Sequence, residues 1–246
     1  MKKILRHLPN FVTSLNGACG ILATVYAFKG QLECAFVLML CAAAFDFLDG
    51  FAARALDAYS SLGKELDSLC DVISFGVLPS VMLYKLMCIC SFSENIFCYI
   101  PLLIAVFSAL RLAKFNVDER QGENFLGLPT PACALLCGAL CSFVAHHSRC
   151  FLATWSAGPV FIPLLSAALC ALLVCEIPMF SMKIKFHSAS SDHKDNILLC
   201  KRIAFGVIIL AAGLVALFCH LHWSFVVMVS FLLYILKNIV YRIAGI

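Results

Sequence analysis

The sequence predicts an all-α protein, a polytopic integral membrane bundle of about eight transmembrane helices. Hydrophobic residues make up 63% of the 246 positions and charged residues only 13%, whereas a soluble domain carries roughly 25% charged residues. The hydrophobic residues also gather in runs of about 17–25, the length that a helix needs to cross a bilayer. We therefore expect one membrane domain over residues 1–246, with no room for an additional soluble domain.

Eight apolar runs, separated by polar breaks, mark the expected spans. Pro9 and Asn10 precede the first run. No small-residue cleavage site follows a short apolar stretch there, so we expect a retained first span and not a removed signal. Asp57 falls in the break between the second and third spans, and longer breaks lie at 116–128 and 181–202. The expected spans lie near residues 11–29, 32–56, 65–90, 96–117, 129–147, 151–175, 203–219 and 222–242.

The distribution of basic residues predicts the orientation of the bundle. Eight spans put both termini on one side, and the opposite face keeps only Lys29, Lys85 and Arg149. The positive-inside rule therefore makes the Lys- and Arg-rich face, with both termini, cytoplasmic. Because topology distributes the basic residues, the net charge of +4 indicates no nucleic-acid partner. The rich face holds Lys2, Lys3, Arg6, Arg54, Lys64, Arg111, Lys114, Arg120, Lys183, Lys185, Lys194, Lys201, Arg202, Lys237 and Arg242.

Cysteine and histidine show no metal-site spacing. The 15 cysteines are scattered along apolar runs and no CxxC pair occurs, which argues against a disulfide scaffold or a zinc site. The seven histidines, His146, His147 and His222 among them, fall mostly near expected loops. We expect them to be interfacial or solvated.

Four aspartates within or beside apolar runs carry the strongest functional signal. Near the bilayer centre each would cost about 2.5–3.5 kcal/mol, so such residues persist when paired, metal-bound or facing water. Their spacings of three and four residues place each pair on one helix face. Two helices with two carboxylates each make an oxygen-rich pocket that suits Mg²⁺, Mn²⁺ or Ca²⁺. The two pairs are Asp46 with Asp49 and Asp67 with Asp71.

The residues after Asp49 indicate what this pocket binds. Hard divalent ions usually serve phosphate chemistry. Gly50 would let a ligand approach the helix backbone, and Arg54, one turn later, offers a planar donor fork to a phosphate or carboxylate. The alternative is that the aspartates are helix-end charges paired with Arg54 and Lys64 at the membrane interface. That arrangement would need neither the glycine nor the repeated aspartate pair.

The aspartate segment resembles the complete signature of the CDP-alcohol phosphatidyltransferase family. All eight fixed positions stand at the family's spacing, as Asp46-x2-Asp49-Gly50-x2-Ala53-Arg54-x8-Gly63-x3-Asp67-x3-Asp71. The resemblance implies that the four aspartates form a site for two divalent ions, Mg²⁺ or Mn²⁺, and that Asp71 is also the general base. It implies a homodimer as well. The residues that it implies for CDP-diacylglycerol binding are Asn10, Thr13, Gly50, Arg54, Ser60 and Gly63.

Further segments resemble the membrane phosphatidylserine synthases of bacteria and archaea within that family. They cover roughly residues 8–185, the expected catalytic core, whereas the spans within 203–242 carry no such segment and are expected to be scaffold. Lys114 departs from the pattern, since Arg is expected there, and Cys70 stands where Ala is common. Neither is an expected metal ligand. The segments are Leu8 to Asn16, Leu66 to Pro79, Ala109 to Asn116, Gly127 to Pro131 and Pro178 to Lys183.

A second basic cluster is the candidate acceptor site. Arg111 and Lys114 share a helix face at the end of the fourth span, Asn116 follows, and Lys183 closes a later span. A zwitterionic acceptor such as serine needs a cation for its carboxylate, which Arg111 or Lys114 could supply, and oxygen acceptors for its ammonium group. The alternative is that these residues are positive-inside anchors that touch lipid headgroups.

The expected function is transfer of the phosphatidyl group from CDP-diacylglycerol to L-serine at the cytoplasmic face of the cell membrane, with release of CMP. The metal and nucleotide motif is shared by enzymes that use glycerol 3-phosphate, inositol phosphate or choline, so these acceptors are alternatives. An alternative of another class is a divalent-metal transporter with the aspartates in its permeation path. The one-sided position of the aspartates and the absence of an internal repeat argue against it.

Overall fold

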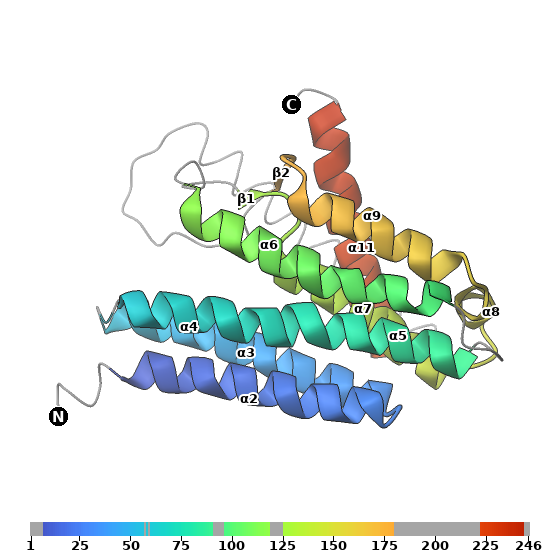
Figure 1. Cartoon of the computed structure of the whole chain (residues 1–246), viewed down its shortest axis with the longest axis horizontal. Coiled ribbons are helices and arrows are strands. Elements are labelled where there is room, and N and C mark those ends of the chain that lie inside the picture. Colours follow the sequence, from blue (N-terminus) through green and yellow to red (C-terminus); the bar gives the residue numbers. More distant parts are fainter. Residues whose placement is uncertain are drawn as a thin grey trace.

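The computed structural model describes residues 7–56, 58, 60–90, 96–118, 125–179 and 222–243. Within these ranges the regular structure is helical except for two strands of two residues each, which confirms the predicted all-α class. Five helices are long and apolar enough to cross a membrane, or six if one bent pair counts as a span. The elements in Figure 1 are α2 (Leu8–Phe28), α3 (Leu32–Ala55), α4 (Ser61–Asp71), η1 (Val72–Val77), α5 (Leu78–Cys90), η2 (Ile96–Leu102), α6 (Leu103–Val117), β1 (Phe125–Leu126), α7 (Thr130–His146), α8 (Phe151–Ala157), α9 (Phe161–Val174), β2 (Pro178–Met179) and α11 (Trp223–Ile243).

The N-terminal helices lie side by side in Figure 1. α2 packs against α3, and α4 continues through η1 into α5 as one helical segment, Ser61–Cys90. Two glycines of α2 lie at the contact with this segment. A Cβ atom added at Gly17 would lie 2.8 Å from Sγ of Cys70, and one added at Gly20 would collide with Ser74. The missing side chains therefore let α2 approach α4 and η1 closely.

α7 lies in the middle of the described bundle. It packs against α3, α5 and α11, and most of its residues are buried. A Cβ atom added at Gly138 of α7 would lie 2.6 Å from the ring of Phe36 on α3. Phe36 in turn stacks on Trp223 of α11, with ring centroids 5.2 Å apart. The Phe36 ring therefore joins three helices in one apolar core.

The direction of the chain decides which helix ends meet. In Figure 1, α2 begins, α3 ends and α4 begins at the left-hand end of the bundle, and α6 also ends on that side. The segments that follow α6 and α9 are tied to each other by the antiparallel pair β1–β2. Gly127, at φ +77°, donates its N–H to the carbonyl oxygen of Ile177 at 2.9 Å. That left-handed conformation favours glycine.

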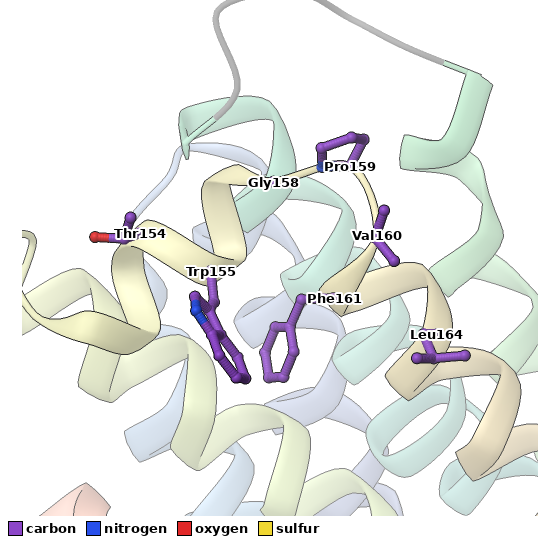
Figure 2. A pocket seen from close by; sticks show the side chains of 7 residues that line it. All are labelled: Thr154, Trp155, Gly158, Pro159, Val160, Phe161 and Leu164. Carbon is purple, nitrogen blue, oxygen red and sulfur yellow. The ribbon is translucent and has the colours of Figure 1, made fainter.

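One expected span differs from the structure. The sequence predicts a single span over residues 151–175, but the chain forms two helices there, α8 and α9. Gly158 and Pro159 lie between them in Figure 2, and proline disfavours the helical conformation of the residue before it. α8 instead follows α7 at a bend of 106°. The rings of Trp155 and Phe161 pack together across the break, with centroids 5.7 Å apart.

The other described spans agree with the sequence prediction to within a few residues at each end. The seventh expected span, residues 203–219, and the expected loop at 181–202 lie outside the described residues. The total of eight spans, the cytoplasmic position of both termini and the assignment of residues 203–242 as scaffold therefore stay predictions.

Candidate active site at the aspartate cluster

Three predicted metal ligands meet where α3 ends and α4 begins. Carboxylate oxygens of Asp46 and Asp49, on α3, and of Asp67, on α4, all lie within 4.8 Å of one another. Asp49 is only 7% exposed, and its Oδ2 atom is buried with no hydrogen-bond partner in the described part of the chain. A buried carboxylate oxygen without a partner is destabilising, so a cation at this point would satisfy it.

The donor set fits a hard divalent ion. Mg²⁺ holds oxygen ligands at about 2.0–2.1 Å, so two ligands of one ion lie at most about 4.2 Å apart. The three carboxylates would reach that geometry through small side-chain rotations. Among the described residues, the group of Asp46, Asp49 and Asp67 offers oxygen ligands alone. Oxygen ligands favour Mg²⁺ or Mn²⁺ over metals that prefer thiolates.

The fourth aspartate, Asp71, lies outside the group of three carboxylates whose oxygens are within 4.8 Å of one another. It is 8% exposed and accepts a hydrogen bond from Nδ2 of Asn16 at 3.2 Å. The negative charges of Asp46, Asp67 and Asp49 all act on it. Neighbouring carboxylates repel one another unless protons or cations compensate them, so the group of three, with Asp71 near it, favours cation binding.

Local helix structure places Asp67 and Asp71. Ser60 caps α4, because its side-chain oxygen accepts the backbone N–H of Gly63 at 3.0 Å. The π-helix η1 starts directly after Asp71, and such wide turns are frequent at functional sites. In η1 the hydroxyl of Ser74 donates to the carbonyl oxygen of Asn16 at 3.1 Å.

Asn16 therefore binds both sides of the junction between α4 and η1, and sequence reasoning missed it as a site residue. It is fully buried. The available signal was an amide side chain three residues after Thr13 in the first span. Its Oδ1 atom is buried with no hydrogen-bond partner among the described residues, so the side chain still has an acceptor to offer.

The residues predicted to bind CDP-diacylglycerol come from three segments, and four of them lie around the start of α4 and the aspartates. A Cβ atom at Gly63 would lie 2.8 Å from Oδ1 of Asn10 and 2.9 Å from Oγ of Ser60. Thr13, one turn after Asn10, is buried, and its hydroxyl donates to the carbonyl oxygen of Pro9 at 3.0 Å. It is also close enough to Asp49 to interact with that carboxylate. The structure thus brings Asn10, Ser60 and Gly63 together, with Thr13 against the carboxylates.

Gly50 and Arg54 lie one turn apart at the end of α3. A Cβ atom at Gly50 would meet no other atom within 4 Å, so the helix surface is open at this point. Nε of Arg54 donates to the carbonyl oxygen of Gly50 at 2.9 Å, which directs the exposed side chain along the same surface. Lys64 donates to the carbonyl oxygen of Asn116 at 3.4 Å. These contacts differ from the helix-end ion pairs of the alternative interpretation.

The predicted acceptor residues do not share one environment. Arg111 is buried, at 7% exposure; its Nη1 donates to Oγ1 of Thr130 at 3.0 Å. Lys114 is half exposed and pairs with Glu176, with 3.2 Å between Nζ and Oε1. Lys183 lies outside the described residues.

Asn116, near the end of α6, contacts α4 next to Asp67. Its Nδ2 donates to Oγ of Ser68 at 2.8 Å, and Ser68 follows Asp67 directly. Arg111 is close enough for the charge of Asp71 to act on it. Of the four predicted acceptor residues, Arg111 and Asn116 therefore have a described connection to the aspartate cluster.

Comparison with known proteins agrees with this geometry. A family model described as CDP-alcohol phosphatidyltransferase matches residues 6–236 of the chain. The chain belongs to this family. CDP-alcohol phosphatidyltransferases in general depend on divalent metal ions, and the carboxylate cluster is where the structure offers ligands for them. Membership in a transferase family also decides against the transporter interpretation.

Curated relatives in this family are similar over part of their length. The chain is 38% identical over 154 residues to the archaetidylserine synthase of Methanothermobacter thermautotrophicus, covering 59% of the chain and 63% of that protein. It is 34% identical over 139 residues to the CDP-diacylglycerol–serine O-phosphatidyltransferase of Bacillus subtilis, covering 56% and 77%. The enzyme of that name from Mycobacterium tuberculosis is 35% identical over 185 residues, covering 72% and 62%. The chain thus spans less than two thirds of the first and third of these relatives.

Proposed function

We propose that the protein transfers the phosphatidyl group from CDP-diacylglycerol to the hydroxyl group of L-serine, yielding phosphatidylserine and CMP. The observation that carries this proposal is the cluster of Asp46, Asp49 and Asp67, in which a buried oxygen of Asp49 has no described partner. The serine acceptor is supported by the relatives, whose names include archaetidylserine synthase and CDP-diacylglycerol–serine O-phosphatidyltransferase.

The nucleotide half of CDP-diacylglycerol would lie over the end of α3 and the start of α4. Gly50 leaves the surface of α3 open there, and the free N–H groups of the Arg54 guanidinium would donate to phosphate oxygens. Asn10, Ser60 and Gly63 lie together at the start of α4, where polar groups of the cytidine could be bound. The acyl chains would remain in the bilayer, because this end of the bundle is formed by membrane-spanning helices.

The four aspartates would hold two divalent ions, Mg²⁺ or Mn²⁺. When bound, these ions would neutralise the pyrophosphate and stabilise CMP as a leaving group. Asp71 would accept the proton of the serine hydroxyl, which is a poor nucleophile while neutral. The hydrogen bond from Asn16 holds the Asp71 carboxylate in place for this role.

Serine itself would bind on the side of the cluster that faces α6. Arg111 supplies a buried cation for the serine carboxylate, and its bond to Thr130 fixes the guanidinium. Asn116, bonded to Ser68 beside Asp67, would contact the ammonium group through its side-chain oxygen. Lys114, which pairs with Glu176, and Lys183 would add positive charge for the acceptor. A phosphorylated acceptor would need more cations than this set provides.

The membrane arrangement follows from the same proposal. The active site would face the cytoplasm, where CMP and serine are soluble, in the cytoplasmic membrane of the cell. The catalytic core would comprise about residues 8–185 of a single domain, and the protein would act as a homodimer.

An acceptor panel tests this function. Purified protein with CDP-diacylglycerol and Mg²⁺ or Mn²⁺ would be supplied in turn with serine, glycerol 3-phosphate, inositol phosphate or choline. CMP release and the lipid product would be measured for each. We expect release with serine, with phosphatidylserine as the product. CMP release with another acceptor and none with serine would keep the chemistry but reject the substrate.

A further inference from the structure

A second group of potential ligands lies at the opposite end of α3 from the aspartates. Glu33 stands in the first turn of α3, His146 in the last turn of α7, and His222 directly before α11. One ligand atom from each of the three lies within 4.8 Å of the others. The rise of α3 separates this group from Asp46 by about 20 Å. It is therefore distinct from the candidate active site.

Contacts within this group hold the rings in position. Nδ1 of His146 lies 3.0 Å from Oε1 of Glu33. The rings of His146 and His222 are stacked, with centroids 4.2 Å apart. Nδ1 of His222 lies 2.7 Å from Oγ of the buried Ser224. Nδ1 also accepts the backbone N–H of Ser224 at 3.4 Å. Metal binding at Nε2 would select the tautomer in which Nδ1 carries the proton and donates it to the Ser224 hydroxyl, and such outer partners commonly support histidine ligands.

His147 adds a third imidazole. Its ring centroid lies 4.8 Å from that of His146 and 6.2 Å from that of His222. Its Nδ1 atom is buried and has no hydrogen-bond partner among the described residues. A buried nitrogen in this state is destabilising unless something binds it. The packing of His147 on the ring of Phe143 keeps it beside the other two histidines.

We propose that Glu33, His146 and His222, with His147 beside them, bind one zinc-type divalent ion that fastens α3, α7 and α11 together. Two histidines and one glutamate are a recurrent zinc ligand set, with Zn–N distances of about 2.0–2.1 Å. Ligand atoms of one such ion lie at most about 4.2 Å apart and each metal–nitrogen bond lies in the plane of its ring, so binding would turn the stacked rings of His146 and His222 toward a common point. Cysteine spacing argued against a zinc site in this chain, but the ligands here are histidines from segments far apart in the sequence. The site is independent of the proposed function.

Zinc binding to the full-length protein tests this proposal. The purified protein would be stripped with a chelator, dialysed against Zn²⁺ in the presence of excess Mg²⁺, and assayed for bound zinc. The excess Mg²⁺ occupies the all-oxygen aspartate site, which prefers hard ions, while nitrogen ligands select Zn²⁺. We expect about one zinc ion per chain. His146→Gln and His222→Gln keep the side-chain size and should weaken binding by at least about 100-fold, since even outer-partner losses cost 10–100-fold.

The matched control is His7→Gln, which changes an exposed histidine just before α2 and should leave zinc binding unchanged. Elution on size exclusion shows whether each variant is folded. Zn²⁺ should also raise the melting temperature of the wild type, but not that of His222→Gln. Stripped wild-type protein that takes up no zinc would overturn the proposal, and would leave Glu33 and His146 as a hydrogen-bonded pair. Equal zinc uptake by wild type and both glutamine variants would overturn it as well.

Discussion

Asp71 has two proposed roles, as a metal ligand and as the acceptor of the serine proton. It is buried beside three carboxylates and fixed by Asn16. Asp71→Asn keeps the size and some coordinating ability but cannot accept a proton. We expect the variant to bind CDP-diacylglycerol in the presence of metal while the single-turnover rate falls by about 10²–10⁴-fold. Affinity and rate would be measured on the same preparation. Turnover near the wild-type rate would remove Asp71 from the mechanism, and equal loss of affinity and rate would make it a metal ligand only.

A substitution at Gly50 distinguishes an effect on substrate binding from an effect on folding. A Cβ atom there meets no protein atom within 4 Å, and alanine is more favourable than glycine in a helix by about 0.8–1.0 kcal/mol. Gly50→Ala should therefore leave the melting temperature unchanged or higher, while the KM for CDP-diacylglycerol rises. Steady-state kinetics and thermal unfolding in detergent give the two readouts. An unchanged KM would place the nucleotide away from this part of α3.

Arg54 is predicted to contact the substrate through the shape of its side chain as well as its charge. Arg54→Lys keeps the charge but loses the planar fork that fits phosphate oxygens. We expect kcat/KM to fall more when CDP-diacylglycerol is varied than when serine is varied. If both values match those of the wild type, Arg54 serves as an anchor at the membrane interface.

At the scale of elements, the contact between α3 and α7 depends on Gly138. A Cβ atom there would lie 2.6 Å from Phe36, and Phe36 cannot retreat freely because it stacks on Trp223. Gly138→Ala should lower the free energy of unfolding by about 1–3 kcal/mol, the usual effect of overpacking. The KM for CDP-diacylglycerol should not change. Thermal unfolding beside Gly50→Ala, the same substitution in open space, isolates the packing effect. An unaltered melting temperature would show that the core yields at Phe36.

The features that the sequence predicted correctly are those that depend on residues close together in the chain. The long spans and the pairing of Asp46 with Asp49 follow from composition and helical spacing, so the sequence predicts them. The break at Pro159 lies within a run that is apolar throughout, and run length alone conceals it. The hydrogen bond from Asn16 to Asp71 joins α2 to α4. Spacing within one segment carries no information about such a contact.

At the scale of the whole molecule, α3 connects two ends with different chemistry. Its last turns carry Asp46 and Asp49 among oxygen ligands, and its first turn carries Glu33 among histidines. The hairpin order of α2, α3 and α4 brings the two halves of the aspartate signature together at one end of the bundle (Figure 1). That arrangement explains how two carboxylate pairs separated by a polar break form one site.

The dependence of turnover on metal and on the aspartates tests the central claim most directly. CMP release from CDP-diacylglycerol and serine would be followed before and after chelation with EDTA, and again after addition of Mg²⁺ or Mn²⁺. We predict that chelation abolishes release and that either ion restores it. Asp49→Ala and Asp67→Ala should remain inactive at any metal concentration, because each removes a ligand and leaves the other carboxylates repelling one another. Full turnover in metal-free wild-type protein, or wild-type rates in both variants, would contradict the account.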